Sequence, residues 1–552
     1  MIKELRIISG PVSISQFNLN RLGENDPQIL TACPNPPPEA VKAGKAIPVP
    51  MGEFSIDIIL DKLPSDFYPD LVQMSARNMH FMPRGLDKLT CPKVIKIGDT
   101  FHWGDGSLSG IIKYCQSFDC DYHWVYQGVQ HLHFFVEAGL KNVFWLPGTP
   151  VIDHYVPQKK EAKSYDIIFR GSQSSLHVYR SNLLKFLQDN GVKIDISRKP
   201  YVESLEDYSK SRIVLNCGLN GDTNRRIFEV IMAGGFLLTD RLSPQSGLFS
   251  LFEEGVHLEC YDSENELLDK IEFYLKHPEQ AEKIAIAGHQ KLIDCYSQQA
   301  IQQKFYRYIL QGEIEPPFRL EHDTRVLHIN QPIEEKKFVI RLKIYELIQE
   351  IHRLNSRIKL LYWKGRNKEL LSDLADLPRL DITYANTTEA LADVKTWCSK
   401  VEVKDQVQLQ SLPLELTGGK QFQMVMVDLP DKLLSIKELL LEIEPQLPES
   451  GFLLVVGKAT IFTKVMLSIL ARWSGLLPIR ICAANSHHQL GVEACLVYQK
   501  LTRPSQAHLV KSTPKLFVPK LSFKAKVSQV LSSLPLVNWT KTLIRNSVLI
   551  KN

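Results

Sequence analysis

Several features that would place a chain in a special class are missing from these 552 residues. No uninterrupted apolar run approaches the roughly 20 residues that a helix needs to cross a bilayer. The ten cysteines are scattered and include no C-x-x-C pair, which favours reduced thiols over a zinc site or a disulfide framework. The first residues, MIKELRIISG, carry charges among their apolar side chains, so we expect no secretory signal. These absences predict a cytoplasmic protein.

Negative charge is absent from the end of the sequence. Residues 501–552 contain nine Lys and Arg but no Asp or Glu. Residues 1–500 hold the other 57 basic side chains against 61 acidic ones, so the net charge of +5 combines a body near −4 with a tail of +9. An acidic body without a known nucleic-acid-binding motif predicts no binding of nucleic acid.

The tail also has an amphipathic pattern. Phe523, Val527, Leu531 and Leu534 recur at helical spacing, with lysines off that stripe, and Trp539 follows. Basic residues around an apolar face suit an anionic membrane surface, which predicts a peripheral contact through residues 522–545 at the inner face of the membrane. The alternative is a helix that docks on the protein's own third domain.

Apolar runs that alternate with helical patterns predict an α/β protein with parallel sheets. We expect an N-terminal domain at 1–160, a second domain at 161–320, a third at 336–500 and a basic amphipathic tail at 501–552. The expected strands include 93–97, 142–146, 165–169, 212–216, 236–239, 358–363, 381–385, 422–428, 452–457, 479–483 and 494–499. Helices are expected at 176–190, at 225–233 and across 264–310, with a break at His277-Pro278.

The most informative segment is 212–240, in which a buried strand runs into a polar, glycine-containing loop and then a helix. In open parallel sheets, ligands gather beyond the carboxyl ends of the strands, where helix N-termini point. Free backbone amides there suit a pyrophosphate, and Arg226 or Arg225 could add charge-assisted contacts. Glu229, one turn into the helix, could accept hydrogen bonds from two ribose hydroxyls. The alternative is that an arginine and Glu229 simply form a surface ion pair.

The same segment carries a family resemblance. RRIFEVIMAGGFLLTD at 225–240 resembles the C-terminal half of CgeB-type (spore-protein-like) glycosyltransferases of GT-B fold. Upstream segments fit in order, among them CPKVIKIGDTFH at 91–102 and IIFRGS at 167–172, so the resemblance covers about 60–310. It implies two Rossmann-like domains, with a nucleotide-sugar donor on the second and the acceptor on the first.

The resemblance also implies roles for single residues. Glu229 matches the family's ribose-binding glutamate, and Arg170, Gly171 and Arg180 match the strand-end loop and helix that approach the donor phosphates. Related retaining enzymes carry a further Glu eight positions before the ribose-binding one. Here that position is Gly221, with Asp222 next to it.

Polar residues in the first domain suggest an acceptor site. Asp99 and His102 follow the strand at 93–97, so His102 could act as a general base toward a hydroxyl and Asp99 could orient it. The alternative is a histidine that caps a loop. Two further patterns are interpreted as non-functional: the D-x-D tripeptide at 119–121 as chance, and the His131/His133 pair as structural, since no third metal ligand is apparent.

The third unit, 336–500, resembles a class I SAM-dependent methyltransferase in its order of elements, with first, fourth and fifth strands near 358, 422 and 452. After the first strand, Gly365 stands alone where a G-x-G turn should approach the cofactor. The second strand ends at Asn386, where an acidic residue would hold the ribose. We therefore expect a degenerate module without SAM, so that the whole chain has two Rossmann-like domains in GT-B arrangement plus a third, methyltransferase-like one.

The sequence thus predicts a metal-independent glycosyltransferase that needs no cofactor and moves a sugar from a nucleotide-diphosphate donor to a hydroxyl acceptor, such as a glycan. The resemblance suggests a setting in the synthesis of a surface polysaccharide or another glycoconjugate. Two alternatives stay open: a non-catalytic scaffold in which both sites have decayed, and a bifunctional glycosyl/methyltransferase.

Overall fold

The computed structural model describes most of the first 500 residues. Described are residues 2–10, 28–76, 78–101, 108–147, 162–173, 178–320, 335–353, 357–401, 403, 405–412, 422–429, 440, 443, 446–459, 476–483 and 492–500. The predicted tail and positions 151–161 of the segment before the second domain lie outside them. Within the described residues, no helix is long and apolar enough to cross a membrane.

The first sheet has eight strands in the order β15-β9-β8-β7-β5-β1-β2-β3. Its neighbouring strands pair in parallel, except that β15 runs antiparallel to β9. The elements up to β9 are β1 (Lys3–Ile7), β2 (Gln28–Cys33), α2 (Pro38–Lys42), β3 (Ala46–Pro48), β4 (Glu53–Ser55), α3 (Asp57–Leu60), β5 (Leu71–Ala76), β6 (Met82–Arg84), η1 (Leu86–Lys88), β7 (Lys93–Ile97), α4 (Leu108–Gln116), β8 (Tyr122–Val125), η2 (Val129–His131), α5 (Leu132–Glu137) and β9 (Val143–Trp145).

The second sheet is fully parallel, with the order β11-β10-β12-β13-β14. Its elements, and those that follow it, are β10 (Tyr165–Arg170), α6 (Val178–Asp189), β11 (Ile194–Ser197), α7 (Tyr201–Ser209), β12 (Ser211–Leu215), α8 (Arg225–Met232), β13 (Leu237–Asp240), η3 (Pro244–Ser246), α9 (Leu248–Leu251), β14 (Glu259–Tyr261), α10 (Glu264–Lys276), α11 (Pro278–Tyr296), α12 (Gln298–Gln311) and β15 (Arg319–Leu320).

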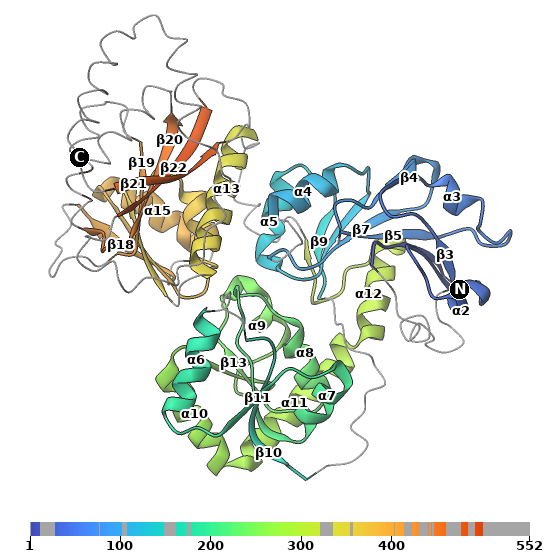
Figure 1. Cartoon of the computed structure of the whole chain (residues 1–552), viewed down its shortest axis with the longest axis horizontal. Helices are drawn as coiled ribbons and strands as arrows, with labels where there is room; N and C mark the ends of the chain where they lie inside the picture. Colours follow the sequence, from blue (N-terminus) through green and yellow to red (C-terminus); the bar gives the residue numbers. More distant parts are fainter. Residues whose placement is uncertain are drawn as a thin grey trace, which may run out of the picture. The chain divides into compact units, whose positions relative to one another are not determined.

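Helices cover both faces of the second sheet (Figure 1). Successive side chains of β10 alternate between the two faces, as the period of a strand requires. Ile167 and Phe169 pack in a core with side chains of α6 and α10, whereas Ile168 packs in a different core with residues of α7 and α8. A strand that is apolar on both faces needs this double cover, which explains the uninterrupted apolar run in the sequence.

The third sheet has seven strands in the order β18-β17-β16-β19-β20-β22-β21, and β22 is antiparallel to both of its neighbours. Counted from β16, strands β19 and β20 are the fourth and fifth, as the sequence predicts. The elements are α13 (Glu335–Arg353), β16 (Ile358–Trp363), α14 (Lys368–Leu374), β17 (Leu380–Asn386), α15 (Thr388–Lys400), β18 (Val407–Ser411), β19 (Met424–Asp428), β20 (Phe452–Ala459), β21 (Leu476–Ala483) and β22 (Val492–Lys500).

The chain returns to the first sheet after it has formed the second. Phe305 of α12 stacks on Trp124 of β8 with 4.7 Å between ring centres, and the Tyr306 hydroxyl bonds the Glu4 carboxylate of β1. Strand β15 then pairs with β9 at the edge of the first sheet. The end of the predicted second domain, 161–320, therefore packs on the first sheet.

The predicted α/β class, with several parallel Rossmann-like sheets, is confirmed. The GT-B arrangement of the first two domains stays a prediction.

Candidate functional site

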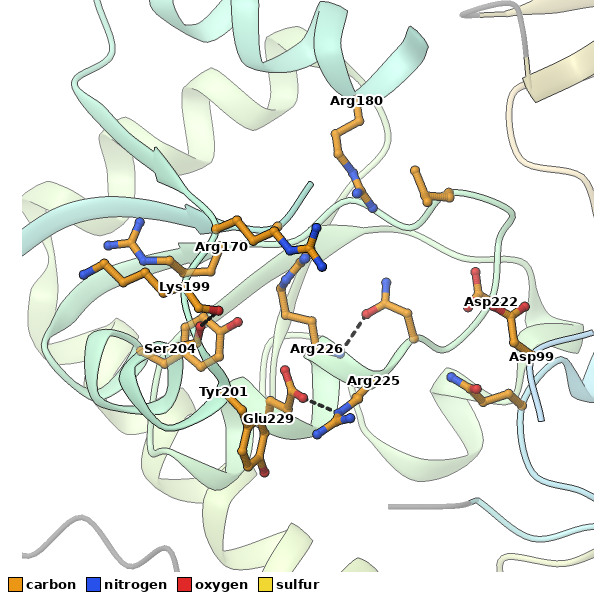
Figure 2. Close-up of a pocket in the computed structure, with 16 residues that line it drawn as sticks. Asp99, Arg170, Arg180, Lys199, Tyr201, Ser204, Asp222, Arg225, Arg226 and Glu229 are labelled. Carbon is orange, nitrogen blue, oxygen red and sulfur yellow. Dashed lines mark hydrogen bonds and ion pairs between the residues drawn. The ribbon is translucent and has the colours of Figure 1, made fainter. Parts of the chain in front are cut away.

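A pocket of about 510 Å³ lies at the carboxyl ends of β10 and β12. The strand order of the second sheet reverses between these two strands, and ligands of open α/β sheets bind at such a switch point. The volume is in the usual range for small-molecule sites, roughly 300–1,000 Å³. The lining residues, drawn in Figure 2, are Asp99, Gln127, Arg170, Gly171, Arg180, Arg198, Lys199, Tyr201, Ser204, Tyr208, Leu219, Asp222, Asn224, Arg225, Arg226 and Glu229.

The pocket brings together nearly all of the predicted site residues. Asp99, Arg170, Gly171, Arg180, Asp222, Arg226 and Glu229 all line it. His102 lies outside the described residues, so its predicted role stays a prediction. Six lining residues are basic and three are acidic, so basic side chains outnumber acidic ones in the lining.

Arg180 and Arg226 are two pocket cations without a carboxylate at ion-pair distance in the part of the chain that the structure describes. Within the described part of the chain, neither forms an ion pair; Arg180 donates to the Cys217 carbonyl at 2.7 Å and Arg226 to the Asn216 Oδ1 at 3.0 Å. Both guanidinium groups lie over the Phe169 ring, at 5.3 and 4.7 Å from its centre.

Arg180 is only 5% exposed, and its Nε has no hydrogen-bond partner among the described residues. Burial, together with the neighbouring charge of Arg226, lowers the pKa of Arg180. Two converging like charges with spare donors favour an anionic ligand.

Arg170 and Lys199, two other cations of the pocket, contact carboxylates. Arg170 ends β10 and contacts two carboxylates, with its Nε 2.6 Å from Asp207 and its Nη1 2.5 Å from Asp195. Lys199 lies 2.7 Å from the same Asp207 carboxylate. These carboxylates offset much of the charge of Arg170 and Lys199. The Arg170 Nη2 is nevertheless buried without a hydrogen-bond partner among the described residues, so the predicted contact of Arg170 with the donor stays a prediction.

Gly171 makes room for Arg226. A Cβ atom at position 171 would lie 2.3 Å from the Arg226 Nη2, well inside van der Waals contact. Any larger residue there would shift the guanidinium from its present place beside the end of β10, so Gly171 leaves room for this position of Arg226.

Helix α8 begins at the pocket. The side chain of Asn224 caps it by accepting a hydrogen bond from the Arg226 amide at 3.1 Å. Glu229 lies one turn in and pairs with Arg225, as the dashed line in Figure 2 shows. The glutamate is no surface group, since its side chain is 12% exposed, and burial raises its pKa while Arg225 opposes that shift. The predicted ion pair therefore exists, but its carboxylate belongs to the pocket wall.

The first sheet contributes Asp99 and Gln127, from the segments after β7 and β8. One Asp99 carboxylate oxygen accepts a hydrogen bond from the Phe101 amide at 2.9 Å, which fixes the turn that leads toward position 102.

The sequence interpretation missed several members of the pocket, notably Gln127, Arg198, Lys199 and Tyr201. One signal could have found three of them. Arg198-Lys199-Pro200 follows a strand and directly precedes a helix, so that the basic pair and Tyr201 fall at the carboxyl edge of the sheet. Gln127 has no such signal.

The D-x-D tripeptide at 119–121 and the His131/His133 pair are interpreted from the sequence as non-functional. In the structure their side chains contact other groups of the protein. Asp119 pairs with Lys141 at 3.3 Å, and Asp121 accepts the Lys93 amide at 2.8 Å. His131 and His133 are both buried: His131 bonds Thr100 and Tyr345 through its two ring nitrogens, and His133 bonds Asp373 at 2.9 Å. No group of three metal-binding side chains occurs among the residues that the structure describes.

In the third sheet, tyrosine side chains fill the space under the turn after β16. Tyr362 is fully buried, and a Cβ at Gly365 would lie 2.3 Å from its ring. Its hydroxyl accepts from the Asn367 amide at 3.2 Å. The Gly365 carbonyl in turn accepts hydrogen bonds from Tyr384 at 2.6 Å and from Asn386 at 3.0 Å. The backbone of this turn therefore packs directly against Tyr362 and is hydrogen-bonded to Tyr384.

Comparison with solved structures finds methyltransferases at low similarity. A putative methyltransferase from Pseudomonas syringae is 18% identical, with 26% of this chain and 90% of that chain covered and a TM-score of 0.21. A predicted O-methyltransferase from Agrobacterium tumefaciens is 11% identical, with 26% and 75% covered and a TM-score of 0.22. A SAM-dependent methyltransferase from Methanosarcina mazei is 11% identical, with 28% and 97% covered and a TM-score of 0.23.

The sequence was also compared with curated proteins and with models of protein families. No curated protein matches the chain. Residues 177–305 match the sequence model of a family described as glycosyl transferase-like. This range holds Arg180, Asp222, Arg226 and Glu229, so the pocket is built largely on a glycosyltransferase-like domain.

Proposed function

We propose that the protein is a glycosyltransferase of GT-B type, similar to the CgeB group, which uses a nucleotide-diphosphate sugar and a hydroxyl acceptor. One observation carries the proposal: Arg180 and Arg226, without ion-pair partners in the described residues, converge at a strand switch point of the glycosyltransferase-like domain. A diphosphate is the anion that two guanidinium groups and the N-terminus of α8 would bind together.

In the proposed reaction, the acceptor oxygen bonds the anomeric carbon while the bond from that carbon to the donor phosphate breaks. The diphosphate leaves with the electron pair, and the acceptor proton passes to a base, for which His102 is the candidate, with Asp99 to orient it. Arg180 and Arg226 offset the charge that develops on the departing diphosphate, a role that needs no metal. Glu229 accepts hydrogen bonds from the ribose hydroxyls. Its carboxylate would then interact with Arg225 and with the ribose at the same time.

The alternative, a non-catalytic scaffold whose donor site has decayed, predicts that the protein does not bind nucleotides. A thermal-shift screen of UDP, GDP, CDP and ADP against the full chain tests it. At a concentration of 100 times its dissociation constant, the correct nucleotide should add about 2.7 kcal/mol of stability. If none of the four shifts the unfolding transition, the proposed function is wrong.

The role of Glu229 predicts a preference for ribose. The nucleotide that binds best should lose about 10- to 100-fold in affinity in its 2′-deoxy form, because hydrogen bonds to a charged group contribute about 1.5–3 kcal/mol. Glu229→Gln should abolish most of this difference. The measurement is calorimetric titration of both nucleotides into each variant.

Glu203→Gln serves as the matched control, since Glu203 is an exposed glutamate on α7 that does not line the pocket. It should keep the wild-type preference. Equal discrimination by Glu229→Gln and the wild type would remove Glu229 from the ribose site.

We further propose that the third module does not bind SAM, because the Tyr362 ring fills the space directly beside Gly365 in the turn after β16, where a cofactor-binding turn would need room. SAM and S-adenosylhomocysteine at 1 mM should leave the unfolding temperature unchanged. Titration of the best nucleotide in the same sample shows that the protein is folded and competent. A saturable SAM signal would instead favour the bifunctional enzyme.

A further inference from the structure

The loop between β12 and α8, residues 218–222, forms one wall of the pocket through Leu219 and Asp222. This 218–222 loop has no regular secondary structure of its own. Its conformation therefore depends on what packs against it, and the contacts come from β13 of the second sheet and from elements of the first and third sheets.

One side of the loop is held by the turn between α14 and β17 of the third sheet, residues 376–379. Arg379 donates to the Leu219 carbonyl at 3.5 Å and lies 3.8 Å from the Asp240 carboxylate. Its guanidinium also stacks on the Tyr179 ring of α6, 3.8 Å from the ring centre. Arg379 adopts a left-handed backbone conformation, with φ of +60°, an uncommon conformation for a residue other than glycine.

Asp240 links this arginine to the start of the loop. The Asp240 side chain accepts a hydrogen bond from the Gly218 amide at 2.7 Å and is almost fully buried. A buried carboxylate needs a compensating charge, and Arg379 is the cation within ion-pair distance of it among the described residues. Loss of Arg379 would therefore weaken the hold of Asp240 on Gly218 as well as the contact to Leu219.

Gly221 shows how closely the turn approaches. It has a φ of +75°, and a Cβ there would lie 3.0 Å from the Pro378 Cδ and 3.1 Å from the Asp376 carbonyl oxygen. On the other side, the Gly221 carbonyl accepts a hydrogen bond from Gln130 of η2 at 3.1 Å. The loop is thus held between elements of the first and the third sheet, and a side chain at position 221 would crowd the 376–379 turn.

We propose that Arg379 is a positioning residue for the donor pocket. The 376–379 turn, which belongs to the third module of the same chain, would hold the 218–222 loop in place and so act as a clamp on it. Arg379 does not line the pocket. It acts through the loop that places Leu219 and Asp222. This role, which rests on the proposed function, gives the methyltransferase-like module a task in glycosyl transfer that needs no cofactor.

The test compares Arg379→Gln and Arg379→Lys with the wild type in the full chain. Calorimetry measures the dissociation constants for UDP, GDP, CDP and ADP, and hydrogen exchange measures the amides of the 218–222 loop. Arg379→Gln should weaken binding of the best nucleotide by about 2- to 30-fold, as changes along a coupled contact network do. It should also speed exchange in the loop. Lysine keeps a charge near Asp240, so Arg379→Lys should recover part of both effects.

Lys368→Gln is the control, because Lys368 belongs to the same module but pairs with Asp393, at 3.0 Å, away from the loop. It should bind and exchange like the wild type. A wild-type dissociation constant or unchanged loop exchange in Arg379→Gln overturns the proposal. If the wild type itself binds none of the four nucleotides, the proposed function fails, while the exchange measurement still decides whether the clamp exists.

Discussion

Replacing Arg226 by glutamine should weaken binding of the best nucleoside diphosphate by about 10- to 100-fold. The substitution removes one of the two guanidinium groups that lie over Phe169 without an ion pair among the described residues, and a charge-assisted hydrogen bond contributes about 1.5–3 kcal/mol. The loss should be specific for phosphate, so that the affinity for the corresponding nucleoside stays the same. Calorimetric titration of both ligands measures the two effects.

The stability of the free protein should respond differently to this substitution. Arg226 lies near Arg180, whose pKa is lowered by burial and by the charge of Arg226. Removal of one of two like charges relieves their repulsion, and this gain offsets the lost hydrogen bond to Asn216. The free energy of unfolding should therefore change by no more than about 1 kcal/mol. Arg212→Gln, which removes an exposed arginine paired with Asp166, controls for a general loss of positive charge. Unchanged diphosphate affinity in Arg226→Gln would contradict the site.

Replacing Arg341 by methionine should cost about 3–5 kcal/mol of stability, the typical effect of removing one partner from a buried ion pair. Arg341 of α13 is 2% exposed and pairs with Glu137 of α5 and with Asp373 of α14, the latter at 3.0 Å. Its loss would remove a cation that contacts two buried carboxylates, of which Asp373 also bonds His133. Urea unfolding followed by fluorescence should show a lower midpoint for the transition.

Two comparisons make this result interpretable. Arg357→Met removes an exposed pair with Asp381 of similar geometry, 2.8 Å, and should cost under about 1 kcal/mol. Neutralising the carboxylates as well, with Glu137→Gln and Asp373→Asn, should restore most of the loss, since the cost arises from uncompensated charge. If Arg341→Met unfolds like the wild type, the cluster does not hold these elements together.

Long apolar runs made much of the fold predictable. Lys93–Ile97 and Ile358–Trp363 are strands with the predicted bounds, and helix α8 ends one residue before its predicted end. β11 was missed because Ile194–Ser197 is a short, half-exposed strand at the edge of its sheet, with an aspartate in the middle. The helical region across 264–310 breaks a second time, at Ser297, whose side chain caps α12. This second break was not predicted because no proline or glycine marks it in the sequence.

The site was predictable where local sequence fixes it. Arg170, Gly171, Arg226 and Glu229 stand at strand ends and in the first turn of a helix, positions that the order of elements reveals. The pairing of Arg170 with Asp207 was not predictable, since Arg170 ends strand β10 and Asp207 lies on helix α7, 37 positions along the chain. The contact of Gly221 with Pro378 spans more than 150 positions and has no signature in either segment.

The return of α12 and β15 to the first sheet means that the second domain is an insertion in the first. Trp124 is covered by Phe305, and β9 gains its antiparallel neighbour only from residues 319–320. A fragment cut after position 160 would therefore expose an aromatic surface and an unpaired strand edge, both of which promote aggregation. The smallest autonomous unit of the first sheet is discontinuous in sequence, so any division of this protein into separately expressed domains has to keep residues 298–320 with the N-terminal part.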